Sequence, residues 1–535
     1  TNDFKTYDRT DQSYWKARME LISQQGNHQV RVGGEYKQWT VRNFGGIFPT
    51  QLTNLNPDSI AAETESIARE LRRAGGDYYG YNEFGEEIDS GPDGPKEPVE
   101  AAAWINDKIE YENIIVNAGL RFNYYDMDLW TPAQGIESPV FSTSESQMPV
   151  GGEAGLVETD ADVNLLPRLG ISFPINDRTA FHLQYGKFSQ MPDLGNAYEG
   201  RAAIGGILSG GNFQPFPFAW DLDPIETTQY EIGFGYQFSE FAAFDVTAYY
   251  RRTDGQLTIK RQQTIETDSD PDTPVPSTDA QPYNYFGNGD FSITKGVEIS
   301  LKTKRIGGVL GRFNYTLTDA RGTNSSPSGQ VAAIENNLPT PSQVQPLEFM
   351  QKHQGTAILD YRSGSDQPIW GRNWGVNLLW RFSSGRRYTR VRSAGSGLGQ
   401  RGVDEGPLLT DTDPRSRVPL EPINSSSTPF TSQLDLRLER GFDVGPATAT
   451  AYIYVQNLLN RKNVNNVYLR TGSSTDDGFL TTPSLSQSIV EGRGQDFVQY
   501  YQQINLQNRH HYRSSWGNDI FGLPRQVRVG FQVRY

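Results

Sequence analysis

The sequence predicts an all-β fold, an antiparallel transmembrane β-barrel. Three observations support this prediction: apolar and polar residues alternate along many segments, turn residues join these segments in pairs, and short and long connections follow one another in strict alternation. The last segment, residues 525–535, shows the alternation most clearly. Side chains on a strand point to alternate faces, so one face of this segment is apolar. That face carries Val527, Val529, Phe531, Val533 and Tyr535.

The apolar face of this last strand is suited to lipid. A shift of the strand by one residue would exchange its two faces and turn Arg528 and Arg534 toward the apolar side. In a membrane, each arginine near the midplane would then cost about 2–4 kcal/mol. The alternation therefore specifies which side chains face hydrocarbon and which face water.

Composition narrows the class of protein. The chain has 535 residues, no cysteine and a formal net charge of −14, which excludes disulfides and thiolate metal sites and argues against nucleic acid as a partner. No apolar run approaches the ~18 residues of a transmembrane helix. Aromatic residues form 12% of the chain, with 27 Tyr and 27 Phe, as interfacial girdles would require. A large soluble β-protein could share this composition.

Seven hairpins are expected before the last strand, each with two alternating arms and a connection rich in turn residues. The one helical signal in the chain lies outside them, at Asp58–Ala74. The arms are expected at 13–23 with 30–36, 101–109 with 114–126, 169–173 with 181–185, 230–236 with 244–250, 297–301 with 311–317, 353–361 with 374–380, and 434–438 with 449–455.

Long connections join one hairpin to the next. Outer-membrane barrels have short periplasmic turns and long extracellular loops, whereas a soluble sandwich has no reason to keep this rule. A propeller would show a repeat of about 40 residues, which we do not find. We therefore expect the long loops outside the cell and the carboxyl terminus in the periplasm.

The expected strand number has a consequence. Seven hairpins and a last strand give about 15 strands, whereas bacterial single-chain barrels have an even number. We therefore expect residues 1–535 to be the carboxyl-terminal portion of an outer-membrane barrel of about 22 strands, preceded by its first strands and a plug. The alternative is one overlooked strand and a complete passive porin of about 16 strands.

Eight strand segments carry a resemblance to a known family. They are Ala102-Ala-Trp-Ile-Asn-Asp-Lys-Ile109, Val116-Asn-Ala-Gly-Leu-Arg-Phe122, Leu166-Pro-Arg-Leu-Gly-Ile-Ser-Phe173, Tyr185-Gly-Lys-Phe-Ser-Gln190, Glu226-Thr-Thr-Gln-Tyr-Glu-Ile-Gly-Phe234, Lys295-Gly-Val-Glu-Ile299, Tyr315-Thr-Leu-Thr318 and Val455-Gln-Asn-Leu-Leu-Asn460. These segments resemble strands of TonB-dependent receptors and follow one another in the family's order along nearly all the strands. Within that family, the chain is most similar to the Oar-like and SusC-like group.

The resemblance implies a receptor in the outer membrane of a Gram-negative bacterium. Its loops would bind an extracellular ligand, which would be imported when the TonB complex pulls on an amino-terminal plug. Outer-membrane lipids, the plug, TonB and a surface lipoprotein are the partners that this implies. The alternative is a structural or adhesion scaffold on the cell surface, which the resemblance also allows.

The polar strand faces would line the lumen of such a barrel. One hypothesis is that their charged residues hold the plug and guide solute, and the other is that they neutralise one another in a wet interior. The candidates are Arg121, Arg168, Glu231, Glu298, Lys302, Asp435, Arg437 and Glu439.

Aromatic clusters in the outer loops are candidate ligand contacts, because ring faces stack on sugars and apolar groups. Packing of the loops on themselves is the alternative. The residues are Tyr78, Tyr79, Tyr81, Phe213, Phe216, Phe218, Trp220, Tyr283, Tyr285 and Phe286.

Other motifs carry little chemistry. Asp268, Asp270 and Asp272 form a D-x-D-x-D run with oxygen ligands for Ca²⁺, but the glycine and terminal Glu of an EF-hand are missing, so a solvated acidic loop is the preferred interpretation. A G-x-G-x-x-G match at 397–402 has no βαβ context and indicates no dinucleotide site. We expect no enzymatic activity and no cofactor.

Overall fold

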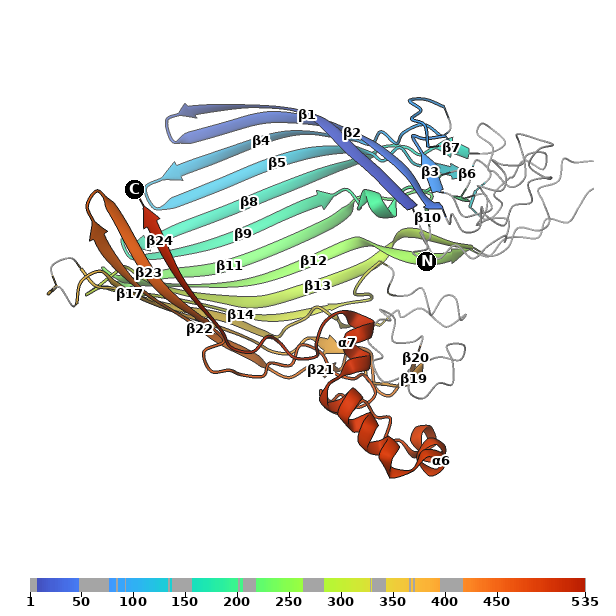
Figure 1. Ribbon diagram of the computed structural model, residues 1–535. Helices are drawn as coiled ribbons and strands as arrows, with labels where there is room; N and C mark the ends of the chain where they lie inside the picture. The colour runs from blue at the N-terminus through green and yellow to red at the C-terminus, as the bar shows by residue number, and fades with distance from the viewer. Residues whose placement is uncertain are drawn as a thin grey trace, which may run out of the picture.

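Most of the chain forms one large curved sheet, which the computed structural model shows as an open, barrel-like wall (Figure 1). The first strand begins among the long connections, and the last strand ends among the short turns. The structure describes residues 7–47, 77–82, 85–91, 93–132, 135–136, 156–200, 203–204, 218–262, 283–327, 329, 343–364, 367–368, 371–394 and 417–534.

The sheet contains 18 strands, of which β3, β10 and β15 are only two or three residues long. The long strands confirm all seven predicted hairpins and the last strand. They are β1 (Tyr7–Gln25), β2 (His28–Ile47), β4 (Val99–Tyr111), β5 (Ile114–Asp126), β8 (Asp162–Asn176), β9 (Thr179–Gln190), β11 (Ile225–Ser239), β12 (Ala242–Gln262), β13 (Tyr283–Thr303), β14 (Val309–Gly322), β16 (His353–Arg362), β17 (Trp374–Ser383), β22 (Thr431–Val444), β23 (Ala447–Gln456) and β24 (Gln526–Arg534).

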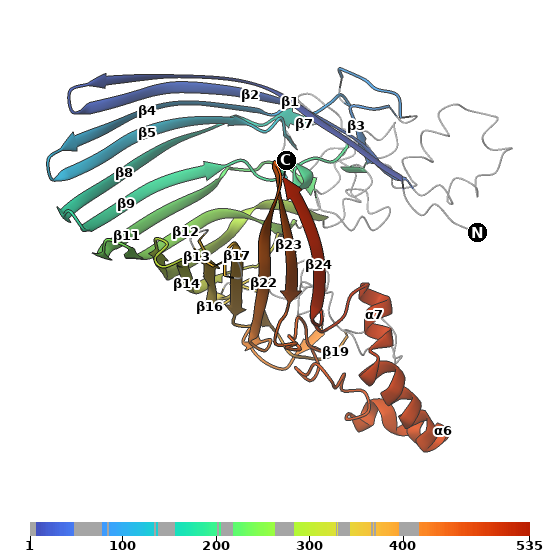
Figure 2. The same cartoon turned by 60° about the vertical axis from the view of Figure 1, so that its left-hand side comes forward.

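These long strands pair antiparallel in chain order, and within the described residues β1 pairs only with β2 and β24 only with β23. Figure 2 shows these two strands at the two edges of the wall. The short strands lie in the long connections. They are β3 (Asp77–Tyr79), β10 (Phe218–Ala219) and β15 (Gln345–Pro346) in the sheet, and the separate pairs β6 (Trp130–Pro132) with β7 (Leu156–Glu158), β18 (Arg387–Tyr388) with β21 (Ser426–Ser427), and β19 (Val391–Ala394) with β20 (Arg417–Pro419).

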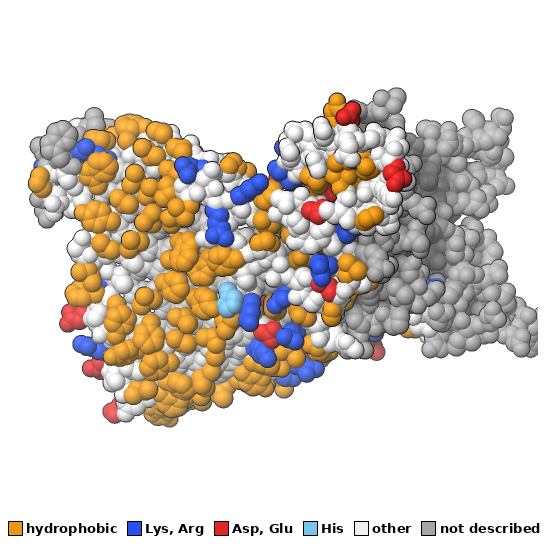
Figure 3. All heavy atoms as spheres, turned by 90° about the horizontal axis from the view of Figure 1, so that it is seen from below, with side chains coloured by type: hydrophobic (Ala, Val, Ile, Leu, Met, Phe, Trp, Pro, Cys, Tyr) orange, Lys and Arg blue, Asp and Glu red, His pale blue; other side chains and the backbone are white. Residues whose placement is uncertain are grey.

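The strand register aligns apolar side chains on the convex face of the wall. Ile453 of β23, for example, lies directly opposite Leu438 of β22 on one side and Val529 of β24 on the other. Val529 is 77% exposed and Phe531 is 65% exposed. Figure 3 shows the apolar surface that such rows produce. A regular, exposed apolar band of this kind is what a lipid-facing barrel wall requires.

Helices occur in the connection between β23 and β24, where none was predicted. They are α6 (Pro483–Tyr501), the π-helix η3 (Gln502–Gln507) and α7 (His510–Trp516), and Figure 2 shows α6 projecting away from the sheet. None of the helices in the described part of the chain could span a membrane.

The prediction that the chain has a single helical signal is therefore wrong. Residues 58–74, which carried that signal, lie outside the described residues. The segment that forms α6 lacks an apolar stripe and contains Gly494, whose φ of 77° interrupts the helix. Only its termini carried a signal: Pro483 in the first turn of α6, and Gly517 with a positive φ after α7.

Candidate functional site

The concave face of the wall carries the side chains that the sequence predicts to line a lumen. Arg121 illustrates the arrangement, because its neighbours Leu120 and Phe122 are 41% and 43% exposed on the opposite face. The residues sharing this concave face come from distant strands, and they form two separate groups of charged side chains.

The first group surrounds a cavity of about 620 Å³ next to the long connections, which we call the arginine pocket. It brings together two predicted lumen residues, Arg121 of β5 and Arg168 of β8. Other residues that line it include Trp39, Glu100, Asn123, Tyr125, Phe188 and Leu194.

Arg121 is fully engaged with other side chains. Its Nη2 donates to Glu35 Oε1 at 2.5 Å, and its Nε donates to Asn123 Oδ1 at 2.6 Å. The other oxygen of Glu35 accepts from Lys16 Nζ at 2.9 Å. Asn123, which is 3% exposed, donates in turn to the Tyr125 hydroxyl at 2.8 Å. These bonds hold Arg121 in one orientation and neutralise its charge.

Arg168 has no carboxylate partner among the described residues. Its guanidinium carbon lies 4.5 Å from the centre of the Phe188 ring, in a cation–π contact that orients the side chain without using its N–H donors. Arg168 also lines a second cavity of about 240 Å³, where Asn106, Asn117 and Gln184 supply amide groups. The pocket therefore offers free donors to an anionic group such as a carboxylate or a phosphate.

The second group of charges, the carboxylate cluster, consists of Asp360 of β16 with Asp435 and Glu439 of β22. Asp435 is 1% exposed. It accepts from Arg381 Nη2 at 2.6 Å, from Gln433 Nε2 and the Asn457 backbone N–H at 2.8 Å, and from the Tyr454 hydroxyl at 3.3 Å. Each lone-pair region of this buried carboxylate thus meets a donor.

The other two carboxylates of the cluster are also paired. Glu439 accepts from Arg437 Nε at 2.7 Å and from Arg362. Asp360 accepts from Arg305 and from Asn377 Nδ2 at 3.3 Å. In this part of the wall, the charged side chains of the concave face therefore neutralise one another.

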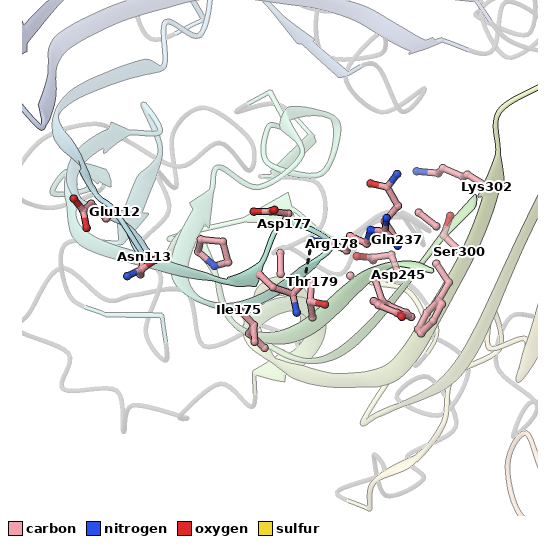
Figure 4. A pocket seen from close by; sticks show the side chains of 17 residues that line it. Glu112, Asn113, Ile175, Asp177, Arg178, Thr179, Gln237, Asp245, Ser300 and Lys302 are labelled. Atoms are coloured by element: carbon pink, nitrogen blue, oxygen red, sulfur yellow. Dashed lines mark hydrogen bonds between the residues drawn. The ribbon is translucent and has the colours of Figure 1, made fainter. Parts of the chain in front are cut away.

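A third cavity, of about 600 Å³, lies beside the short turns (Figure 4). Arg178 and Lys302 line it together with Asp177 and Asp245, so its walls carry both signs of charge. The remaining predicted lumen residues lie on the same concave face. Glu231 accepts from Gln229, and Glu298 makes no ion pair with any described residue.

Comparison with models of protein families shows the family to which the chain belongs. The model of the family described as TonB dependent receptor-like, beta-barrel, matches residues 1–458. The chain belongs to the TonB-dependent receptor family. Its members are bacterial outer-membrane receptors that work with TonB and a plug domain. A comparison with curated sequences found no match.

Solved structures of similar fold cover most of this receptor chain at low identity. The FrpB iron transporter from Neisseria meningitidis is 12% identical with a TM-score of 0.46, over 85% of this chain and 53% of that one. The ferric-catecholate import receptor Fiu from E. coli K12 is 14% identical with a TM-score of 0.45, over 86% and 52%. The copper transporter OprC is 12% identical with a TM-score of 0.45, over 86% and 53%. The chain thus spans about half the length of these proteins.

The predicted ligand-contact aromatics of the receptor are mostly buried. Tyr78, Tyr79 and Tyr81 are at most 6% exposed, and the Tyr81 hydroxyl donates to Asp11. A second cluster contains Phe218, Trp220, Tyr283 and the half-buried Tyr285, and Phe286 is buried in the neighbouring core. Within this cluster, Trp220 Nε1 donates to the Tyr283 hydroxyl at 3.0 Å. These rings pack the loops against the sheet.

Several predicted candidates cannot be placed. Phe213, Phe216 and the acidic run Asp268, Asp270 and Asp272 lie outside the described residues, as does the glycine-rich segment 397–402. Among the residues that are described, no three His, Asp or Glu side chains are grouped as metal ligands.

One feature of the loops was not predicted from the sequence, a half-buried pair of acids, Asp77 and Glu199. Asp77 Oδ1 accepts from the Gly200 backbone N–H at 2.6 Å, and its Oδ2 accepts from Asn43 Nδ2 at 2.6 Å. Burial raises the pKa of Asp77 and raises that of Glu199 well above its usual range, and the charge of Asp77 adds to the second effect. Because 121 residues separate the two acids, no local pattern could reveal them.

Proposed function

We propose that this receptor binds an extracellular ligand bearing an anionic group and imports it with an amino-terminal plug. The observation that carries the proposal is Arg168, an orientated arginine without a carboxylate partner among the described residues, at the wall of a 620 Å³ cavity on the concave face. The Phe188 ring orients the guanidinium of Arg168 and leaves its N–H donors available to a ligand in the cavity.

The proposal includes an orientation in the membrane, with the long connections outside the cell and the carboxyl terminus in the periplasm. The asymmetry of the connections supports it: β1 and β2 are joined by two residues, whereas the connection from β23 to β24 holds three helices. The same asymmetry separates periplasmic turns from extracellular loops in outer-membrane barrels generally.

The proposal also includes further strands and a plug. The two edge strands, β1 and β24, each pair on one side only within the described residues, and the chain spans about half the length of the solved structures of similar fold. In a barrel of about 22 strands, the preceding strands would close the wall and a plug would contact the charges of the concave face. A surface lipoprotein is a further proposed partner.

The import function is tested by substrate depletion. Cells that express the full-length receptor are grown in a medium of defined anionic solutes, and the solutes left in the medium are measured by mass spectrometry. We expect the same solute to remain when TonB is deleted and when the receptor carries Arg168→Gln. Arg528→Gln, a change on the concave face outside the pocket, is the matched control and should leave depletion intact. Depletion that is independent of TonB would instead indicate a passive pore.

The membrane placement is tested separately on β24. Val529→Arg puts a charge on the proposed lipid face, at about 2–4 kcal/mol, whereas Arg528→Val removes one from the concave face. We expect the first variant to assemble poorly in outer membranes and the second to assemble normally. Equal amounts of folded receptor for both variants would refute the assignment of faces.

A scaffold or adhesion role is the second candidate function, and the projecting helix α6 favours it (Figure 2). Removal of residues 483–516 distinguishes the two functions. A scaffold would lose attachment of its partner and show no import in any variant, whereas an import receptor would keep its TonB-dependent depletion of solute or lose it together with ligand binding.

A further inference from the structure

The convex face of the wall contains an apolar groove of about 490 Å³ across β8, β9, β11 and β12. Three tyrosines, Tyr185, Tyr230 and Tyr250, lie directly opposite one another in consecutive strands and form one row across it. Their ring centres are 5.1 Å and 6.3 Å apart. Below this row the groove is lined by Leu169, Ile171, Leu183 and Ile232.

A row of cations borders the groove on the side of the long connections. Lys187 and Arg252 lie opposite the same residue, Thr228, so the two cations are two strands apart, or about 10 Å between backbones. The row continues through Ile293 to Arg321. Lys295 lies next to it, directly opposite Tyr250. Figure 3 shows Lys and Arg side chains gathered where the apolar surface gives way to the long connections.

These four cations outnumber the carboxylates beside them. Arg252 pairs with Asp254 at 2.9 Å, while Arg321 and Lys295 share Asp319 at 3.1 Å and 3.8 Å. Lys187 makes no ion pair within the described residues.

One more carboxylate, Glu226, lies in the following row next to Asp254, and it accepts from Asn164 Nδ2 at 3.1 Å. In the register of the sheet, Glu226 lies two rows beyond Tyr250 and Lys295. Counted over the described residues, the rim therefore has four cations and three carboxylates, which leaves an excess of positive charge.

The apolar groove and the cations at its rim are complementary to the acyl chain and the anionic head group of a membrane lipid. A groove on a face exposed to hydrocarbon is filled by acyl chains, tyrosines mark the interface, and cations at the interface attract anionic head groups. We infer that the groove and its rim form a site for a phosphate-bearing membrane lipid. The acyl chain lies in the groove under the tyrosine row, and the phosphate binds Lys187, Arg252 and Lys295. This inference rests on the proposed membrane placement.

The site is tested with full-length receptor in detergent micelles. The probe is phosphorylated glycolipid extracted from outer membranes, before and after enzymatic removal of its phosphates, and native mass spectrometry measures the bound fraction. Each cation removed should weaken binding of the phosphorylated lipid about fivefold. Lys187→Gln and Lys187→Gln with Arg252→Gln test this series. Dephosphorylated lipid should bind to the wild-type receptor more weakly than phosphorylated lipid binds to the double variant, because that variant keeps Lys295.

Two further variants distinguish binding of the lipid's acyl chain from binding of its head group. Ala248→Phe fills the groove, which Ala248 lines, and should weaken binding of both lipid forms. Arg440→Gln is the matched control, because Arg440 also points outward, over the Trp374 ring, but on a strand outside the groove. It should leave binding of both forms unchanged.

Two results would overturn the inference. One is equal binding of the phosphorylated and dephosphorylated lipids, and the other is displacement of the lipid by an excess of inorganic phosphate alone, which would show a site for free anions. Failure of the proposed membrane placement is detected independently, by the heat-modifiable gel mobility of the receptor in vesicles, because lipid binding in micelles does not depend on which way the barrel inserts.

Discussion

The arginine pocket and the carboxylate cluster lie on the same concave face, but their charged side chains differ in how completely they are paired. In the cluster, Asp435 meets four donors and Glu439 meets two arginines. In the pocket, Arg121 is paired with Glu35, while Arg168 contacts the Phe188 ring and has no carboxylate partner within the described part of the chain. The cluster has the features of a support for the wall, and the pocket has those of a place for an incoming anion.

Burial explains the difference. Removing a carboxylate such as Asp435 from water costs several kcal/mol, so it is stable only when every oxygen has a donor. Arg168 lines an open cavity and remains hydrated, so it tolerates the lack of a counterion. The completely paired cluster is therefore arranged to stabilise the wall, and the incompletely paired pocket is the place where we propose that an anion binds.

The largest expected effect is on the carboxylate cluster. Asp435→Ala should lower the free energy of unfolding by about 3–5 kcal/mol, because it leaves Arg381 and the Asn457 N–H without their acceptor. Urea denaturation of the receptor in detergent, followed by tryptophan fluorescence, measures the change. Glu298→Ala, on the same face but without an ion pair among the described residues, is the control and should change it by less than about 0.5 kcal/mol. Similar losses for both variants would remove the distinction between the two groups.

The next effect is on binding in the arginine pocket. Arg168→Gln should weaken binding of pyrophosphate or succinate about tenfold, because a charge-assisted hydrogen bond is lost. The same variant should change the free energy of unfolding by less than about 0.5 kcal/mol. Calorimetric titration of the wild-type and variant receptors measures the affinity. A large loss of stability without a change in affinity would place Arg168 with the structural charges.

A smaller effect is expected at the paired arginine of the pocket. Arg121→Met should lower the free energy of unfolding by about 1 kcal/mol, since Glu35 loses one charged hydrogen bond but keeps Lys16. The denaturation midpoint of this variant should lie between those of Arg168→Gln and Asp435→Ala. Lys16→Met serves as the counterpart, because it removes the other partner of Glu35. A midpoint equal to that of Asp435→Ala would mean that pairing in the pocket contributes as much to the stability of the receptor as pairing in the cluster.

Asp77 and Glu199, the acid pair in the loops, differ from both of these groups, because two side chains of the same charge lie together. The pKa values of Asp77 and Glu199 are raised in the folded receptor, so these acids stabilise the loop below about pH 4, where unfolded acids are protonated. That stabilisation is lost as the pH rises through their folded-state pKa values. The protection factors of the amides of residues 193–200, which compare the measured hydrogen-exchange rates with those of an unstructured chain at the same pH, should therefore fall from pH 4 to pH 8. Asp77→Asn with Glu199→Gln should remove this dependence, and an unchanged profile would exclude the pair as its cause.

The wall could be predicted from the sequence because lipid imposes one rule on every strand. Val527, Val529 and Phe531 must share a face, and the same rule places Arg121 and Arg168 on the other face. The rule says nothing about which charges meet across strands. Arg121 meets Glu35, which lies more than 80 residues away in the chain, whereas no acidic side chain among the described residues pairs with Arg168.

The loops followed no such rule. The burial of Tyr81 and Trp220, which the sequence analysis considered as ligand contacts, depends on partners that the loops bring from elsewhere in the chain. Helix α6 has no apolar stripe, so periodicity could not reveal it.

The strands of the wall differ greatly in length. β12 and β13 have 21 residues each, which extend to about 70 Å, whereas β23 has 10 and β24 has 9. The apolar band of an outer-membrane barrel is about 25 Å tall. This height is close to the length of the short strands but is less than half the length of the long ones. The edge of the wall next to the long connections is consequently uneven, because β1 and β2, with 19 and 20 residues, are also much longer than β23 and β24. In the proposed orientation, the ends of β12 and β13 next to the long connections would therefore stand farther above the apolar band than the corresponding ends of β23 and β24.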